Sequence, residues 1–389
     1  MKHKKSFFKG ALFGALVVLS GISAVSCSLG KAGNAAEAGG ADSDKMELLN
    51  ALIDEYYTGE VDEEKLEEGI YKGYIEGLED PYSAYYDEDE TAKMTEMTTG
   101  EFGGIGVVVT QDKETQTTRV LQVYEDSPAD NAGIKEGDIF YKIEGEDITG
   151  QDINAVVKKI KGEIGTTVQL TMLRGDSREE KEFAVKRDTI VEQTVESKMT
   201  EEGIGYIRIT EFASVTYDQY KEAIDSLEEQ GMERLIVDLR NNPGGNLKTV
   251  CQILDLMLPE GLIVYTEDKN GEKEEYTSDA EHVFEKPLVV LMNGNSASAS
   301  EIFGGAIQDY GTGQIVGTQS YGKGLVQQIF DLQDGTSVKL TIAEYFTPKG
   351  RNINGTGIAP DVEIEYVYDE NNPDRDNQLE KAIETVKNI

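Results

Sequence analysis

Three serines stand on alternate positions in the sequence GNSASASE, at residues 296, 298 and 300, and Glu301 follows them. The apolar run at residues 288–293 predicts a buried strand, and the apolar spacing over residues 301–310 predicts a helix. The serines therefore occupy a strand–turn–helix corner. Ser298 and Glu301 fit a capping box, which satisfies free N–H groups at a helix start. Such a corner can also hold a nucleophilic hydroxyl beside free backbone amides, so both roles stay open at this point.

A catalytic serine needs a base, and histidine is poorly placed to supply one in this chain. The histidines are His3 and His282. His282 precedes the strand at 288–293, whereas the serines follow it, and a strand of that length spans about 20 Å. A lysine can replace histidine if burial in an apolar pocket lowers its pKa. Lys323, in the sequence SYGKGLVQQ, is the candidate, and a solvated turn residue is the alternative interpretation.

Metal-dependent and cysteine-dependent hydrolysis have less support. The sequence contains no histidine cluster and no HExxH or EF-hand spacing, so we predict neither a metal site nor a cofactor. Cys251 lies on the apolar face of a predicted helix, where a small buried hydrophobic side chain is expected. Cys27 is the other cysteine, and it lies near the N-terminus. No disulfide framework is therefore predicted.

Composition limits the binding partners of the folded part. The chain has 389 residues, with 37 basic and 74 acidic side chains and a formal charge of -37. Such an acidic surface repels nucleic acid and anionic lipid headgroups, so we expect neither as a partner of the folded part. The length allows two or three domains.

The N-terminus has a different character. It carries Lys2, Lys4, Lys5 and Lys9, and an uncharged apolar stretch follows at residues 11–27. This pattern is typical of a secretion signal or a signal anchor, which we place at residues 1–30. Lipid anchoring at Cys27 and a segment that is left uncleaved or is cleaved elsewhere are both open. In either case we expect the body to work outside the cytoplasm, with membrane contact through this segment alone.

The remainder of the chain divides by pattern into four parts. Residues 31–44 are rich in small residues and predict a flexible linker. Residues 45–97 have helical periodicity, and residues 98–187 predict short strands, one of them over 104–110, with one amphipathic helix. Residues 188–389 alternate strands and helices with short glycine turns. We therefore expect a multi-domain α/β (α+β) chain with an N-terminal helical segment, a β-barrel-like domain and an α/β core of strand–turn–helix units.

The predicted β-rich part resembles a PDZ domain. The resemblance rests on the segment EDSPADNAGIKEGDIFYKIEGEDI and on the sequence FGGIG at residues 102–106. In PDZ domains the glycine loop binds a peptide's C-terminal carboxylate through successive backbone N–H groups, while the peptide adds as a strand. The resemblance thus implies that Gly103, Gly104, Ile105 and Gly106 bind peptide C-termini.

Four separated motifs resemble the carboxyl-terminal processing (tail-specific) proteases. They are LIVDLRNNPGG, NSASASEIFGGAIQDYG, SYGKGLVQQ and TPKGRNINGTGIAPDV, and the resemblance covers residues 45–389 with the parts in the family's order. In that family the middle serine of the SASAS motif is the nucleophile. A lysine 25 residues later is the base, and a glutamine four residues further on orients the lysine. The resemblance thus implies that Ser298, Lys323 and Gln327 are the catalytic residues.

Peptide hydrolysis also needs an oxyanion hole. Attack on a carbonyl builds negative charge on its oxygen, and preorganised N–H donors stabilise that charge. Ala299, at the predicted helix start, can supply one donor. Gly244 or Gly245 of the NPGG turn can supply another, because glycine lets the backbone approach a ligand closely. The choice between the two glycines stays open, as does the interpretation of NPGG as a plain tight turn.

These patterns predict a secreted or membrane-anchored serine endopeptidase. The resemblance implies that its partners are protein or peptide substrates with free C-termini, which the PDZ domain recognises. The alternative is a catalytically silent PDZ scaffold or ligand-binding relative with the same fold. An activating partner protein and a homo-oligomer are both left open by the sequence.

Overall fold

The structure is a computed structural model of the chain, and it describes residues 40–200, 202–279 and 281–389. The chain divides into two compact units, Met1–Glu63 and Glu64–Ile389. Helix α1 (Gly40–Tyr56) belongs to the first unit. The predicted signal at residues 1–30, with Cys27, lies outside the described residues. No helix within the described ranges has both the length and the apolar composition that a membrane span requires.

The second unit begins with two helices that flank a short strand. These elements are α2 (Glu63–Glu76), β1 (Ala84–Tyr86) and α3 (Glu88–Thr99). The sequence does not predict β1, since three residues within a helical pattern give too little signal. The strand forms because Tyr85 and its neighbours pair with a strand much later in the chain, in the register Tyr85↔Val338. Asp87 then starts α3, and Gly100 ends it with φ 74°.

The PDZ-like part consists mainly of an antiparallel sheet with strand order β3-β4-β5-β7-β8, with β6 paired to β5. Strands β2 and β9 form a separate pair. The strand predicted at 104–110 is confirmed from Val107 onward as β3, but its predicted start is wrong, because Gly106 adopts φ 80° and separates β2 from β3. The elements are β2 (Glu101–Gly104), β3 (Val107–Gln111), β4 (Thr118–Val123), α4 (Pro128–Ala132), β5 (Ile139–Ile143), β6 (Glu146–Asp147), α5 (Ile153–Ile160), β7 (Thr167–Arg174), β8 (Glu179–Lys186) and β9 (Asp188–Val191).

The C-terminal part contains a six-stranded sheet with order β10-β11-β12-β15-β16-β19, in which β10 alone runs antiparallel to its neighbour. Its strands are β10 (Val195–Met199), β11 (Ile204–Ile209), β12 (Arg234–Asp238), β15 (Leu288–Met292), β16 (Gln314–Gly317) and β19 (Val362–Glu363). The central strand β15 is buried along its whole length, which explains its continuous apolar sequence. The mixed α/β architecture confirms the predicted fold class.

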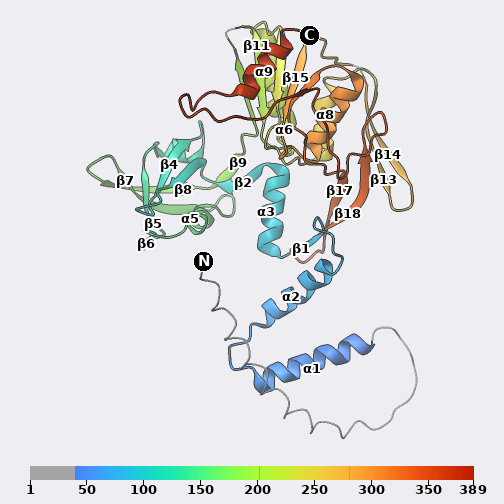
Figure 1. The fold of residues 1–389 in the computed structure, drawn as a ribbon. Helices are drawn as coiled ribbons and strands as arrows, with labels where there is room; N and C mark the ends of the chain where they lie inside the picture. Colours follow the sequence, from blue (N-terminus) through green and yellow to red (C-terminus); the bar gives the residue numbers. More distant parts are fainter. Residues whose placement is uncertain (1–39, 201, 280) are drawn as a thin grey trace, which may run out of the picture. The chain divides into compact units, whose positions relative to one another are not determined.

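Helices cover both faces of this sheet (Figure 1). One apolar cluster joins a face of the sheet to α6 (Thr216–Glu229), α7 (Leu247–Asp255) and α8 (Ala299–Tyr310). A second cluster joins the opposite face to α9 (Asn377–Val386), through Ala382 and Val386. The carboxyl ends of β12 and β15 therefore lead into turns that meet at one edge of a sheet with both faces covered.

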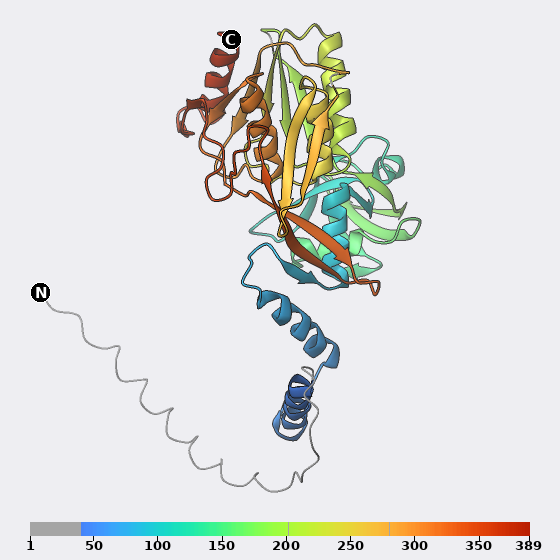
Figure 2. The same cartoon turned by 90° about the vertical axis from the view of Figure 1, so that its right-hand side faces the viewer.

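A second sheet has the order β1-β18-β13-β14, and β17 pairs with β18 (Figure 2). Its remaining strands are β13 (Gly261–Asp268), β14 (Lys273–Ser278), β17 (Leu325–Asp331) and β18 (Ser337–Phe346). The sequence does not predict the β13–β14 hairpin, because its second strand is charged and lacks clear apolar alternation. In this sheet β18 has both β17 and β1 as neighbours. It therefore joins the segment after Lys323 to the segment before α3.

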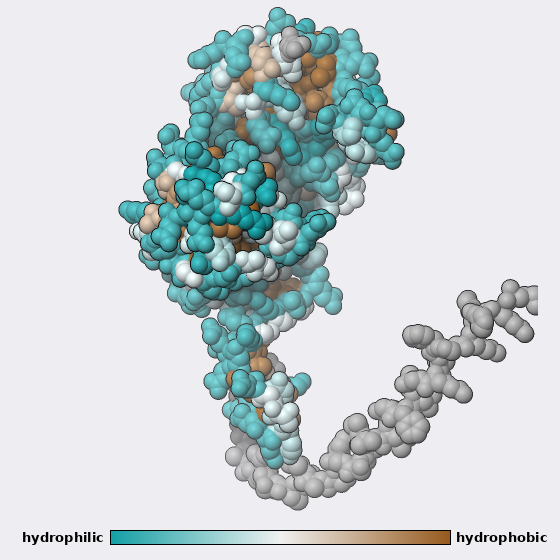
Figure 3. All heavy atoms as spheres, turned by 90° about the vertical axis from the view of Figure 1, so that its left-hand side faces the viewer, coloured by the Kyte–Doolittle hydropathy of each residue, from teal (hydrophilic) through white to brown (hydrophobic). Residues whose placement is uncertain are grey.

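Hydrophilic side chains cover most of the face shown in Figure 3. The apolar side chains are instead concentrated in the buried clusters of the two domains' sheets and their helices. Among the described residues, the buried acidic side chains are Asp138, Asp238, Glu301 and Asp309, so most of the acidic side chains lie on solvated surfaces.

Candidate active site

The turn that carries the three serines exposes one of them. Ser296 and Ser300 are fully buried, whereas Ser298 is only half-buried. The Ser296 hydroxyl donates to the Leu239 carbonyl at 2.8 Å, and the Ser300 hydroxyl donates to the Asn242 carbonyl at 3.0 Å. The flanking serines therefore fasten the turn to the segment after β12. Ser298 is the one that can meet a substrate.

Ser298 has an unusual backbone conformation. It precedes the first residue of α8, with φ 55° and ψ -115°. A positive φ is strained for a residue with a side chain, and it persists where surrounding contacts enforce it. Strain of this kind at a strand-to-helix turn is characteristic of exposed nucleophiles.

The NPGG turn lies directly against Ser298. A Cβ atom added to Gly244 would lie 2.8 Å from the Ser298 Cβ and 2.9 Å from the Ala299 nitrogen. The N–H of Gly244 donates to the Asn242 side chain at 2.8 Å. Among the hydrogen bonds of the described residues, the N–H groups of Gly245 and Ala299 have no acceptor. These two N–H groups are therefore available as donors; Ala299 directly follows Ser298, and Gly245 directly follows the glycine that packs against it.

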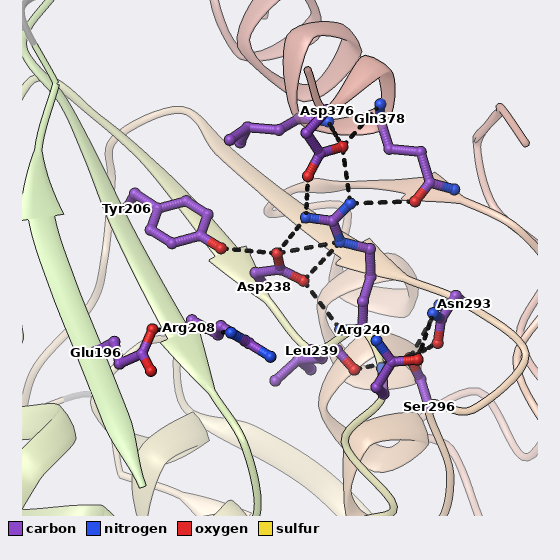
Figure 4. A network of polar contacts seen from close by, with 12 residues as sticks. Glu196, Tyr206, Arg208, Asp238, Leu239, Arg240, Asn293, Ser296, Asp376 and Gln378 are labelled. Atoms are coloured by element: carbon purple, nitrogen blue, oxygen red, sulfur yellow. Dashed lines mark hydrogen bonds and ion pairs between the residues drawn. The ribbon is translucent and has the colours of Figure 1, made fainter. Parts of the chain in front are cut away.

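An arginine network holds the segment that leads into this turn (Figure 4). The Arg240 guanidinium binds both oxygens of Asp238 and both oxygens of Asp376, with Nη2 at 2.8 Å from the Asp376 Oδ2. The Tyr206 hydroxyl also donates to Asp238, at 2.8 Å. Because Asp376 caps α9, the network joins the end of β12 to the C-terminal helix. Bidentate pairs of this kind fix geometry more firmly than single ion pairs.

One buried carboxylate joins the serine turn to the lysine segment. Glu301 is fully buried. It accepts the N–H groups of Ser298 at 2.9 Å, Gly322 at 2.7 Å and Lys323 at 2.8 Å. The Ser320 hydroxyl donates to the same carboxylate at 2.5 Å. Sequence reasoning assigns Glu301 only to the helix cap and misses its role toward residues 320–323, which no local pattern reveals.

Tyr345, in β18, makes a second connection between the same two segments. Its hydroxyl donates to the Lys323 carbonyl at 2.6 Å and lies 3.1 Å from the Ser298 carbonyl oxygen. Burial, followed by the charge of Glu301, raises the pKa of Tyr345 well above its ordinary value, so the hydroxyl stays a donor. No sequence pattern marks this residue as part of the site.

The Lys323 side chain is partly buried just before β17. Burial lowers the pKa of Lys323, and the positive charge of Lys339 lowers it further, while Asp80 and Glu301 oppose both effects. The Nζ lies 4.8 Å from the centre of the Tyr82 ring. In the described part of the chain, no hydrogen bond joins this Nζ to Ser298 or Gln327. The structure thus brings the backbones of Ser298 and Lys323 together without joining their side chains.

Gln327 lies in β17, on the strand that follows Lys323. Its side-chain amide donates to the Thr341 hydroxyl at 3.3 Å. Gln327 is therefore held against β18, and the structure shows no hydrogen bond from it to the lysine amine within the described residues. Its orienting role stays a prediction.

The glycine loop of the PDZ-like part is anchored through its carbonyl groups. The Gly103, Ile105 and Gly106 carbonyl oxygens accept backbone N–H groups at 3.2, 2.8 and 3.0 Å, respectively. A Cβ atom on Gly103 would lie 2.2 Å from a carbonyl oxygen, so the close packing requires glycine there. Gly104 ends β2 and is buried. The loop's role in peptide binding stays a prediction.

Sequence reasoning assigned no catalytic role to His282 or Cys251. His282 is exposed in the segment before β15. Cys251 is buried in α7, and burial raises the pKa of its thiol to about 12, as suits a small hydrophobic side chain.

Three family models match the chain. Peptidase family S41 matches residues 203–364, the PDZ domain matches residues 119–174, and the Activating protease CtpB N-terminal domain matches residues 12–91. The chain is 37% identical to the Carboxy-terminal processing protease CtpA of Bacillus subtilis over 331 residues, which are 85% of this chain and 70% of that protein. It is 36% identical to CtpB of the same organism over 82% of this chain and 67% of that protein.

A solved structure has the same type of fold. It is an S41 protease from Bacteroides fragilis, which matches with a TM-score of 0.50 over 82% of this chain and 90% of that one. The sequence identity is 16%, so this likeness bears on the fold alone.

The fold and the comparisons define a serine protease that carries a PDZ domain. Within that class, the chain belongs to the carboxy-terminal processing proteases of peptidase family S41. The predicted enzyme class is thereby confirmed.

Proposed function

We propose that this protease cleaves peptide bonds with Ser298 as nucleophile and Lys323 as general base. The neutral Lys323 amine takes the hydroxyl proton as Ser298 Oγ attacks the substrate carbonyl. The resulting ammonium then gives that proton to the leaving amine nitrogen, and an acyl-enzyme forms. Water attacks the acyl-enzyme in the same way and regenerates the serine. Gln327 orients the amine during these transfers.

In this mechanism the oxyanion is bound by the N–H groups of Gly245 and Ala299. Both groups are free of other acceptors among the described residues, whereas the Gly244 N–H is occupied by Asn242. Glycine at position 244 is needed for a different reason, since any side chain there would meet Ser298. These contacts favour Gly245 over Gly244 as the donor.

The Glu301 carboxylate is the observation that carries the proposal. One buried group binds the backbone N–H of both the nucleophile and the base. A fixed backbone at both positions preorganises the pair, so that only the lysine side chain must move to reach the serine. The lowered pKa of Lys323 supports the same assignment, because a base must be neutral to accept a proton.

Cleavage of an unstructured protein tests the proposal. The full chain should degrade fluorescein-labelled β-casein, and Ser298→Ala and Lys323→Ala should each lose this activity while keeping the wild-type circular dichroism spectrum. Ser177→Ala is the matched control, because this serine is exposed in the turn between β7 and β8 and its loss should leave the nucleophile in place. Casein cleavage by Ser298→Ala at the wild-type rate would disprove the assignment.

We further propose that the loop at residues 103–106 binds substrate C-termini. Peptides with a free carboxylate should then bind Ser298→Ala protein more tightly than their amidated forms, by roughly 1.5–3 kcal/mol, the scale of a hydrogen bond to a charged group. Isothermal titration of matched peptide pairs measures this difference. Equal affinity for the two forms would remove the carboxylate from the recognition mode.

The proposed site of action is outside the cytoplasm. The basic start and the apolar stretch at residues 11–27 support a protein held at the outer side of a membrane. Fractionation of the native host should recover it with membranes and sensitive to added protease. Full-length protein in the cytoplasmic fraction alone would contradict this location.

A further inference from the structure

The short segment at residues 80–83 lies against the proposed base. It connects α2 to β1, and its Tyr82 ring centre lies 4.8 Å from the Lys323 Nζ. An aromatic face attracts an ammonium through its quadrupole, and a neutral amine loses that attraction. Burial, followed by a hydrogen bond to Tyr321, raises the pKa of Tyr82, so its hydroxyl stays neutral. The ring therefore offers Lys323 a position that depends on the protonation state of the amine.

The same segment is connected to the proposed orienting glutamine. The Ser83 hydroxyl donates to the Asp80 carboxylate at 2.6 Å and accepts the Thr341 N–H at 3.1 Å. The Thr341 hydroxyl in turn accepts the Gln327 amide at 3.3 Å. The pairing of β1 with β18 holds this chain of hydrogen bonds in place, because β1 directly follows residues 80–83 and β18 contains Thr341.

Four charged or polar groups face the Lys323 amine. Asp80 and Glu301 favour its charged form, and Lys339 opposes that form. Although burial raises the pKa of Asp80, hydrogen bonds from Ser83, Thr341 and Tyr82 lower it overall, so Asp80 is ionised at neutral pH. Tyr82 adds the aromatic face. Two of these four groups thus come from residues 80–83.

We propose that residues 80–83 position the catalytic groups, with Tyr82 binding the protonated Lys323 amine and Asp80 fixing Gln327 through Ser83 and Thr341. Both are positioning residues that act through Lys323 and Gln327. When the amine is neutral it leaves the ring and reaches Ser298, and it returns to the ring when it takes up a proton from solvent in the free enzyme. This inference rests on the proposed Ser298–Lys323 mechanism.

The test is the pH profile of kcat/KM for labelled β-casein, whose ascending limb reports the pKa of the base in the free enzyme. Tyr82→Leu keeps an apolar cover but removes the aromatic face, so the limb should move to lower pH by about one unit. Asp80→Asn should move it in the same direction and also lower the plateau, because Gln327 loses its anchor. Lys339→Gln should move the limb to higher pH, because it removes the positive charge that lowers the pKa of Lys323. This variant therefore shifts the limb in the opposite direction from the other two.

Two controls make the outcome specific. Tyr82→Phe retains the ring face, and its limb should stay close to that of the wild type. Tyr74→Leu removes an exposed tyrosine from α2 and should leave the limb in place. Circular dichroism and thermal melting identify any variant that fails to fold. If Tyr82→Leu does so, Asp80→Asn and Lys339→Gln decide the outcome.

The inference would be overturned if the ascending limb of kcat/KM kept its wild-type position in folded Tyr82→Leu and Asp80→Asn. A loss of activity by the same factor at every pH would overturn it as well. Lys323→Ala, assayed in parallel, separates this failure from failure of the mechanism. If Lys323→Ala is inactive and the limbs do not move, only the role of residues 80–83 is wrong. If Lys323→Ala retains wild-type activity, the proposed base itself is wrong.

Discussion

The serine turn and the lysine segment are held in different ways. Around Ser298, the buried side chains of Ser296, Ser300 and Glu301 fix the turn, and Gly244 packs directly against it. Around Lys323, the hydrogen bonds between described residues fix the backbone N–H and the carbonyl. Its amine contacts an aromatic face and lies among charges of both signs. The proposed nucleophile is thus defined by its fixed position, whereas the proposed base is defined by its protonation state and by where its side chain lies.

The most severe test of this contrast is a change at Lys323 that keeps the charge. Arginine does not lose its proton in a protein, so Lys323→Arg removes the base while retaining a long cationic side chain. We expect Lys323→Arg and Lys323→Ala to lose activity alike, by roughly 10²–10⁴-fold, the usual contribution of general base catalysis. Casein cleavage measures the loss, and Lys221→Arg, at an exposed position on α6, is the control. Cleavage by Lys323→Arg at close to the wild-type rate would remove the lysine from the role of base.

A substitution at Gly244, in the Ser298 region, should act by displacing the backbone around the serine. In Gly244→Ala the new Cβ would lie 2.7 Å from the Ala297 carbonyl oxygen and 2.8 Å from the Ser298 Cβ, at φ 107°. We expect kcat to fall by about 10²-fold, as when an oxyanion donor is misplaced. Gly150→Ala also has a positive φ, of 80°, but meets no atoms, so it isolates the strain alone. Equal kcat in the two variants would mean that the packing of Gly244 against Ser298 does not matter for catalysis.

The carboxylate that joins the two regions should matter for stability as well as for activity. Glu301→Gln replaces one accepting oxygen with an NH₂ group, which would face N–H donors in a fully buried site. Each buried donor left without an acceptor costs about 1–3 kcal/mol, so the free energy of unfolding should fall by at least that amount. Urea denaturation measures it. Glu222→Gln, exposed on α6, should leave stability unchanged within experimental error.

The smallest expected effect concerns the cost of burying the lysine. The folded-state pKa of Lys323 lies below the ordinary value of 10.5, so the unfolded chain binds its proton more tightly. The wild type therefore carries a stability penalty that is complete below the folded-state pKa and disappears as the pH rises through 10.5. Lys323→Met should be more stable than the wild type at about pH 7, and the difference should shrink at higher pH. A difference that grew with pH would contradict the lowered pKa.

The sequence predicted the serine turn better than the environment of the lysine, for a physical reason. The corner at residues 296–301 is local, since a buried strand, a turn and a helix start follow one another within a few residues. The contacts of Lys323 come from Tyr82 and Tyr345, which lie on other strands and segments of the chain. Such pairings are set by sheet formation, which no local pattern encodes.

The difference between local patterns and contacts set by sheet formation also explains which strands the sequence failed to predict. Strand β1 is three residues long and exists because β18 accepts it as a neighbour. In the β13–β14 hairpin the second strand is charged and mostly exposed, so its alternation is weak. The central strand β15, by contrast, is buried and apolar along its whole length, and its observed range of 288–292 agrees closely with the predicted range of 288–293.

Activation of Ser298 by a lysine with a lowered pKa, and by no histidine, is the centre of the proposed mechanism. The most direct measurement is the pH dependence of kcat/KM for the wild type and for His282→Gln. We expect a single ascending limb below 10.5 that is the same in both proteins, because Lys323 must lose its proton before it can act. A limb near pH ~6.5, the ordinary pKa of histidine, that disappears in His282→Gln would contradict the mechanism.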